Sequence, residues 1–171
     1  MNLVRSFGVL VASALVAGVA AATPVTWTLS GATLDDGSVA SGSFTYDAAT
    51  GVYSDWDIDF TAGAARPAIS YDASAAVNAL SSEFNIVLTL GALPSDYMNL
   101  AFASALTDAG GTVALALGQF YEFPTKSWEC DNCSSIRNFT GGSVTSTVPE
   151  PATLLLAATL LAGVAVGRRR G

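Results

Sequence analysis

The sequence predicts an all-β domain, an antiparallel β-sandwich or jelly-roll-like fold, that lies between two apolar terminal segments. Apolar and polar residues alternate with a period of two through much of the middle of the chain, which is the pattern of half-buried strands. These short runs recur between turns rich in Gly, Asp and Pro, as they do in β-sandwiches. No exact repeat unit is visible in the sequence, so a solenoid or a propeller is disfavoured.

The expected strands follow in order along residues 23–148. Residues 25–30 form the first, and residues 43–46 and 52–60 form a hairpin that closes at Gly51, because glycine readily adopts positive φ. The alternation in residues 52–60 predicts two faces: one carries Val52, Ser54, Trp56, Ile58 and Phe60, and the water-facing one carries Tyr53, Asp55, Asp57 and Asp59. Further strands are expected at residues 84–90, 98–106, 112–120 and 142–147, with turns at residues 91–94 and 108–111 and a short helix or an irregular crossing at residues 73–80.

The first 22 residues have the pattern of a signal peptide for the Sec translocon. Arg5 supplies the positive region, residues 7–19 the apolar region, and Ala20-Ala21-Ala22 a small-residue site for signal peptidase. We expect cleavage after Ala22, with Ala20 and Ala21 as competing positions. An uncleaved anchor is the alternative, and the shortness of the apolar stretch argues against it.

The last 23 residues combine three unlike elements. Pro149 and Pro151 favour an extended backbone around Glu150, which suits presentation to a protease. Residues 152–167 then form an uncharged run, and three arginines follow that should stay in the cytoplasm: Arg168, Arg169 and Arg170. A core helix would be polar on one face, whereas this run has only Thr153 and Thr159 as polar residues. As a helix it would be roughly 24 Å long, somewhat short for a permanent anchor, and we expect a membrane-inserted segment.

This order of Pro-Glu-Pro, apolar run and arginine cluster resembles the PEP-CTERM sorting signal of Gram-negative bacteria. The resemblance implies that an exosortase cuts near Pro149, Glu150 and Pro151, after transient anchoring in the inner membrane. It also implies delivery to the cell surface or the extracellular matrix, with an association with exopolysaccharide and biofilm. A second resemblance, to the N-terminal part of many small proteins with this signal, rests on residues 27–31, Asp36-Gly37 and residues 42–51.

Composition restricts the function of residues 23–148. Three cations against thirteen carboxylates give this region a net charge of −10, which disfavours binding to nucleic acid. The chain has no histidine, so triads and zinc sites that depend on imidazole are excluded. A hydrolase with paired carboxylates is disfavoured because no motif places two of them about a bond. We therefore expect a protein without catalytic activity or a cofactor.

Two cysteines lie close together, as Cys130-Asp131-Asn132-Cys133. Zinc would lack further ligands, and a redox-active pair normally opens a helix in a thioredoxin-like fold. An exported protein meets an oxidising compartment, which favours a local disulfide in a turn just before the final strand. Reduced thiols are the remaining alternative.

Two further sets of residues are candidates for binding. Asp55, Asp57 and Asp59 could hold calcium only with ligands from a neighbouring loop, such as Asp35, Asp36 or Asp47, and a solvated acidic face is the alternative. The second set consists of rings that a carbohydrate-binding module could use, although core packing also explains them: Tyr53, Tyr71, Tyr97, Tyr121, Phe123 and Trp128.

Overall fold

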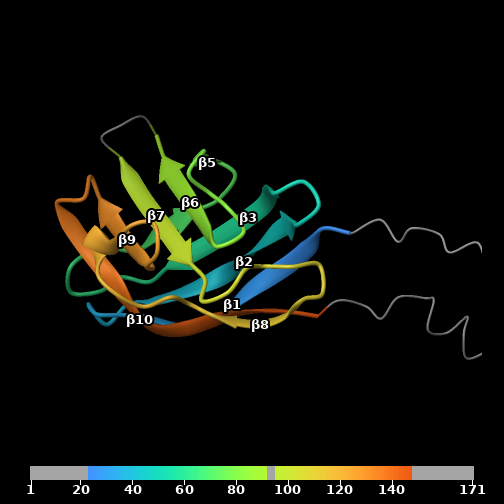
Figure 1. The fold of residues 1–171 in the computed structure, drawn as a ribbon. Coiled ribbons are helices and arrows are strands. Elements are labelled where there is room, and N and C mark those ends of the chain that lie inside the picture. Colours follow the sequence, from blue (N-terminus) through green and yellow to red (C-terminus); the bar gives the residue numbers. More distant parts are fainter. Residues whose placement is uncertain (1–22, 92–94, 148–171) are drawn as a thin grey trace, which may run out of the picture.

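A computed structural model describes residues 23–91 and 95–147. These residues form antiparallel strands and one short 3₁₀ helix, so the predicted all-β, antiparallel class is confirmed (Figure 1). The elements are β1 (Val25–Leu34), β2 (Val39–Asp47), β3 (Val52–Phe60), β4 (Ile69–Tyr71), β5 (Ala75–Val77), β6 (Asn85–Leu90), β7 (Asp96–Ala101), β8 (Gly111–Ala114), η1 (Phe120–Glu122), β9 (Trp128–Asp131) and β10 (Ser135–Ser146).

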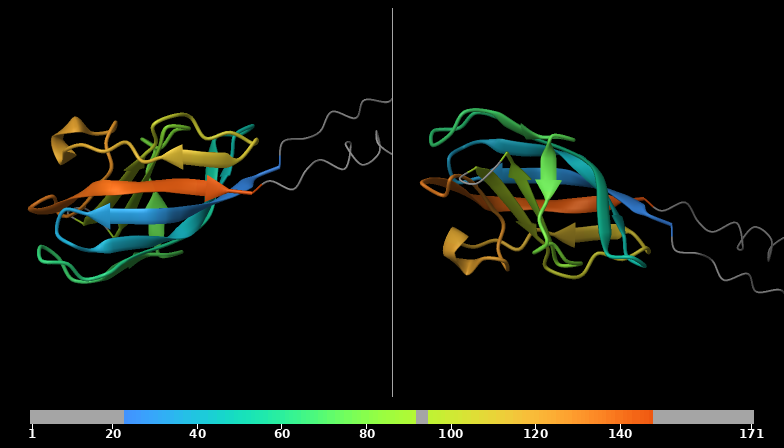
Figure 2. Two further views of the ribbon diagram at one scale, coloured as in Figure 1. Left: turned by 90° about the horizontal axis from the view of Figure 1, so that it is seen from below. Right: turned by 90° about the horizontal axis from the view of Figure 1, so that it is seen from above.

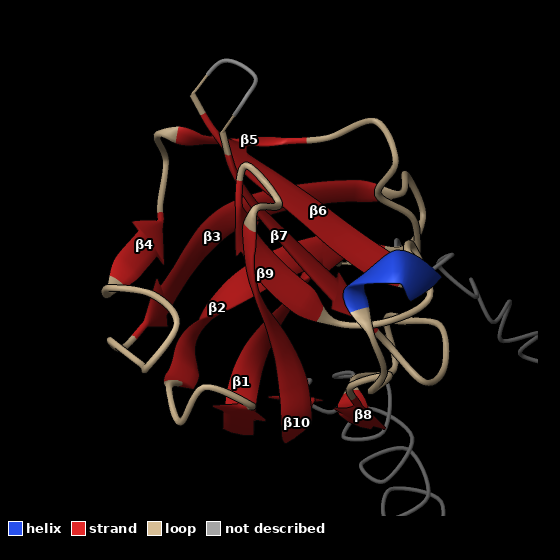
Figure 3. Cartoon of the chain, turned by 90° about the vertical axis from the view of Figure 1, so that its left-hand side faces the viewer, coloured by secondary structure: helices blue, strands red, loops and turns tan. Residues whose placement is uncertain are grey.

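The strands belong to one sheet that bends over itself, in place of the two separate sheets of an ordinary sandwich (Figure 3). Its order is β4-β3-β2-β1-β10-β9-β7-β6-β5, and β8 pairs with β10 outside this path. Strand β10 joins the two halves: its first residues pair with β9, and its last residues pair with β1 and β8. Gly142 lies at the bend, where a Cβ atom would stand 2.7 Å from the Cα of Ala32. A side chain there would block the close approach of β10 to β1.

The inner faces of the two halves enclose the hydrophobic core. In β1 the buried residues alternate with exposed ones, as a strand with one covered face requires. Large rings from β2 and β3 fill the space beside aliphatic side chains from β6 and β7. Phe44 of β2, for example, stacks on Phe102, which follows β7, at 5.8 Å between ring centroids. The core is thus built across the fold and not within one hairpin.

Strand β3 has the predicted bounds, but its predicted faces are wrong at one end. Tyr53 is buried together with Ile58 and Phe60, whereas Val52 is exposed. The reason is a β-bulge: Ser43 pairs with Asp57 and Thr45 with Ser54, so two residues of β3 oppose one of β2. Asp55 occupies the bulge with a φ of 50°, a conformation that Asp tolerates better than most residues. The extra residue reverses the alternation on its N-terminal side.

Other elements differ from the sequence prediction in extent. Strand β10 begins at Ser135 and not at residue 142, and β4 and β9 were not predicted. Strands β7 and β8 end earlier than expected, and only a bridge between Phe102 and Leu115 continues them. The segment 73–80 contains β5 and turns, so its helical alternative is wrong. The turn at residues 108–111 is confirmed, whereas part of the expected turn at residues 91–94 lies outside the described residues.

The first and last residues of the domain lie side by side at one end of the fold. Strand β1 begins beside the end of β10, and η1 lies at the opposite end of the domain (Figures 1 and 2). The predicted signal peptide, with Ala20 and Ala22, and the sorting tail from residue 148 onward lie outside the described residues. Within the described residues, no helix is both long and apolar enough to cross a membrane.

Candidate functional site

A hollow of about 590 Å³ lies on the outer face of the half-sheet that contains β6, β7 and β9. We call it the aromatic groove, because four of its lining residues carry rings. Its lining consists of Asn78, Leu80, Val87, Tyr97, Phe120, Phe123, Trp128, Asn132 and Cys133. Its size falls in the range of ordinary small-molecule sites, which are mostly apolar with a few polar groups.

Strand pairing brings the floor of the groove together. Val87, Asn99 and Trp128 lie in one cross-strand row, because Val87 pairs with Asn99 and Asn99 pairs with Trp128. Tyr97 pairs with Cys130 one row away on the same face. Residues from three separate parts of the chain therefore meet at one place on the sheet.

The segment around η1 forms one wall of the groove and packs its rings against Trp128. The ring of Phe120 meets the Trp128 ring edge-on at 4.8 Å between centroids, and the ring of Phe123 does so at 5.8 Å. These are favourable geometries for aromatic pairs. Trp128 is only 4% exposed, whereas Phe123 is 38% exposed. Phe123 thus offers ring surface to solvent from a supported position.

Buried amides fasten this wall to the sheet. The side-chain amide of Asn99 donates hydrogen bonds to the carbonyls of Pro124 and Lys126, at 3.0 and 2.6 Å. The amide of Asn85 donates in turn to Asn99 Oδ1 at 3.0 Å. The Ser127 hydroxyl both accepts from the amide of Ala101 and donates to its carbonyl, each at 2.9 Å. Buried polar groups that are satisfied in this way rigidify their surroundings.

The β9–β10 turn forms one rim of the groove. The predicted disulfide between Cys130 and Cys133 is confirmed, and it closes this turn before the final strand. Asn132 and Cys133 have φ values of 46° and 48°, and the backbone N–H of Asn132 donates a hydrogen bond to the carbonyl of Ser95 at 3.0 Å. The pair therefore lies in a β-turn, where it shapes a binding surface, and not at the start of a helix.

The predicted rings divide into two groups. Tyr97, Phe123 and Trp128 line the groove, whereas Tyr121 is 80% exposed and is not part of its lining. Tyr53 and Tyr71 belong to the core, where burial raises the pKa of both phenols above the ordinary value. Sequence reasoning missed Phe120, Asn78 and Asn132 as lining residues, since their place depends on the path of the loops.

The predicted calcium ligands do not gather. Asp55, Asp57 and Asp59 point to solvent along β3, while the other three candidates are engaged elsewhere. Asp35 accepts from Asn138, and Asp47 accepts from the amides of Ala49 and Thr50. Although burial favours the neutral acid, hydrogen bonds from Ser38 and the charge of Arg137 lower the pKa of Asp36. Among the described residues, no group of three His, Cys, Asp or Glu side chains could hold a metal ion.

A buried ion cluster is the largest feature that the sequence did not predict. Glu129 of β9 forms salt bridges with Arg66 and Arg137, which are two of the three cations in residues 23–147. Tyr71 donates to Glu129 Oε1 at 3.0 Å, Arg66 also contacts Asp96, and Arg137 Nη1 donates to the carbonyl of Thr61 at 3.1 Å. Glu129 and Arg137 are fully buried. The cluster links β9 and β10 to the loop after β3, and its role in the fold is structural.

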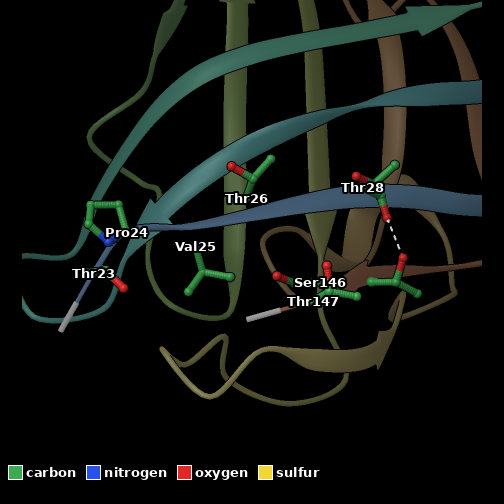
Figure 4. Close-up of a pocket in the computed structure, with 8 residues that line it drawn as sticks. Thr23, Pro24, Val25, Thr26, Thr28, Ser146 and Thr147 are labelled. Carbon is green, nitrogen blue, oxygen red and sulfur yellow. Dashed lines mark hydrogen bonds between the residues drawn. The ribbon is translucent and has the colours of Figure 1, made fainter. Parts of the chain in front are cut away.

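A second hollow, of about 610 Å³, lies where β1 begins and β10 ends (Figure 4). Its lining consists of Thr23, Pro24, Val25, Thr26, Thr28, Thr145, Ser146 and Thr147. The dashed line in Figure 4 is the hydrogen bond that the Thr145 hydroxyl donates to the carbonyl of Thr28 at 3.4 Å. We call it the base hollow, because it lies where the domain begins and ends. The polar side chains of its lining are all hydroxyl groups, which distinguish poorly between ligands. The base hollow is therefore a weaker candidate site than the aromatic groove.

The last lining residue of the base hollow, Thr147, is also the first residue of a sorting motif. Residues 147–170 match the PEP-CTERM protein-sorting motif. The match includes Pro149, Glu150 and Pro151 as well as the arginine cluster. It confirms the predicted resemblance of this segment to the PEP-CTERM sorting signal. The protein is therefore exported and targeted to an exosortase, with a sorting signal that directs it towards the cell surface. No curated protein and no solved structure was found to match the chain.

Proposed function

We propose that this protein is a non-catalytic component of the surface or extracellular matrix of a Gram-negative bacterium, where it associates with exopolysaccharide. The observation that carries the proposal is the position of the sorting motif. Strand β10 ends at Ser146 and the motif begins at residue 147, so the folded domain directly precedes the sorting signal. A Sec signal peptide, cleaved after Ala22, completes the route through the inner membrane.

The described residues offer little support for catalysis. The fully buried carboxylate, Glu129, is held between two arginines, and the acidic row of β3 faces water without a neighbouring acid–base partner. The chain also has no histidine. A general acid or base normally needs a pocket and a second positioned group. These features favour a role in binding or assembly.

One observation favours a second candidate, a carbohydrate-binding module. The aromatic groove combines ring surfaces with two asparagine side chains, on a rigid sheet and away from both termini. Pockets of this kind bind uncharged organic ligands. The two candidates agree, because a matrix protein that binds polysaccharide would need such a site.

The test follows the protein in the cells that produce it. The mature form should lack residues 168–170, as mass spectrometry of its C-terminus would show, and its bulk should fractionate with the matrix polysaccharide. In cells that cannot make the polysaccharide, the processed protein should appear in the medium. A Glu150→Ala variant provides the unprocessed control. Surface-delivered protein that keeps its arginines would contradict processing, and matrix retention without polysaccharide would contradict the proposed association.

A further inference from the structure

We infer that the aromatic groove is a binding site for an uncharged polysaccharide, and that Phe123, Tyr97 and Asn132 make the main contacts. The inference rests on the proposed function, since it names the ligand and the site of that role.

The lining suits a sugar chain in both of its properties. The apolar C–H face of a sugar ring packs on aromatic surface, which Phe123, Phe120 and Tyr97 supply. Sugar hydroxyls need partners that both donate and accept hydrogen bonds, as the side-chain amide of Asn132 and the hydroxyl of Tyr97 do. Among the described residues, none forms a hydrogen bond with the side-chain amide of Asn132 or with the hydroxyl of Tyr97. They are thus available to a ligand.

The groove is built before a ligand arrives. Its wall is fixed by the Asn85–Asn99 amides, and its rim is fixed by the disulfide between Cys130 and Cys133. Trp128 supports Phe123 from beneath. A preorganised site loses less conformational entropy on binding, which matters for sugars because their individual contacts are weak.

Charge selects among polysaccharides. No lining residue among those described carries a charge, so the groove has no cation to pair with a uronic acid or a sulfate. The surrounding domain has a net charge of −10 over residues 23–148, which repels a polyanion at low ionic strength. An uncharged chain avoids both penalties, and hydroxyethyl cellulose and galactomannan are suitable probes.

The direction of the groove fits a ligand outside the cell. Both termini leave from one end of the domain, and η1, which forms the wall of the groove, lies at the other (Figures 1 and 2). A domain that is held through its C-terminal end would keep this groove directed away from the point of attachment. The site therefore stays accessible before and after processing.

Affinity electrophoresis of the mature protein tests the site. Migration should be retarded by gels with hydroxyethyl cellulose or galactomannan and unaffected by alginate, a polyanion. Phe123→Ala and Asn132→Ala should each weaken retardation about tenfold, as truncation of a central contact commonly does. Phe84→Ala is the matched control, because Phe84 is 50% exposed and does not line the groove. Melting curves should show all three variants folded.

The other outcomes are distinct. Equal retardation of Phe123→Ala and wild type would overturn the groove as the site, and equal retardation on alginate would overturn the selection by charge. A dimer that Phe123→Ala converts to a monomer would assign the groove to a second copy of the chain. No retardation of a protein that is still processed and retained in the matrix would overturn this inference and leave the proposed function standing.

Discussion

Removing the charge of Glu129 should strongly destabilise the domain without changing its shape. In Glu129→Gln the side chain keeps its volume, but Arg66 and Arg137 lose their shared carboxylate while their side chains are only 5% and 0% exposed. Arg137 would then face Asp36 alone, at 3.7 Å, and Arg66 would face Asp96. Each arginine thus keeps one weaker or less buried partner, and removing one member of a buried ion pair costs about 3–5 kcal/mol. A domain of this size has a stability of about 5–15 kcal/mol, so the variant should be marginal.

Urea unfolding of the mature protein, followed by tryptophan fluorescence, measures the effect. With an m-value of about 1.5–2 kcal/mol/M, the loss lowers the midpoint by about 1.5–3 M of urea. Asp57→Asn is the matched control, since it makes the same change of carboxylate to amide on the exposed face of β3. It should change the free energy of unfolding by less than about 0.5 kcal/mol. A Glu129→Gln midpoint within the error of the control would refute the reasoning, because the cluster would then contribute nothing to the fold.

Three further predictions test other parts of the structure. Burial raises the folded-state pKa of Tyr53 and Tyr71 above the unfolded value of about 10. The contribution of these two phenols to stability is therefore complete below about pH 9 and is lost as the pH rises past about 10. Urea midpoints should fall between about pH 9 and pH 11, less steeply in Tyr53→Phe, and a flat profile would contradict this. The double change Cys130→Ser and Cys133→Ser should lower the free energy of unfolding by about 2 kcal/mol or less, since the disulfide closes a short loop. Thermal melting measures this loss, and intact mass with and without reductant checks that the wild type has the bond. Global unfolding of the variant at room temperature would contradict the peripheral role of the bond. In Gly42→Ala the new Cβ would stand 1.9 Å from the carbonyl oxygen of Asp57, whereas at Gly37 nothing lies within 4 Å of such an atom. Because both glycines have positive φ, Gly42→Ala should lower the free energy of unfolding by about 2 kcal/mol more than Gly37→Ala does, as thermal or urea unfolding would show. Equal losses in the two variants would show that the close approach of β2 to β3 is not rigid.

The sequence predicted the parts of the fold that ordinary alternation describes. The bounds of β3 agree with the structure because a clean period of two follows a turn at Gly51. The prediction that Tyr53 faces water was wrong, because a bulge at Asp55 shifts the alternation by one residue. A single Asp in the sequence does not reveal a bulge.

Strand β9 and the start of β10 were missed for a different reason. Glu129 and Arg137 occupy buried positions in these strands, and a pattern that assigns charged residues to the surface reads such segments as loops. The two charges are interior because they neutralise each other.

The candidate site was predictable only as an inventory of residues. Tyr97, Phe123 and Trp128 were named as rings, but their meeting depends on the pairing of β7 with β9, which are far apart in the sequence. Local patterns report local structure, whereas this groove arises from long-range register. The cysteine pair is the exception. Its short spacing, the turn-forming residues Asp131 and Asn132 and the oxidising compartment of an exported protein together predicted the disulfide and its turn.

The two ends of the domain divide its tasks. Because β10 runs directly into the sorting motif and lies beside the start of β1, the sorting signal continues from the end of the domain where β1 begins. The aromatic groove belongs to the other end, on β6, β7, β9 and the segment around η1. The ion cluster around Glu129 joins the strands of these two regions through β9 and β10. None of the clustered residues lines the groove, so the cluster supports the groove only through the strands that carry both.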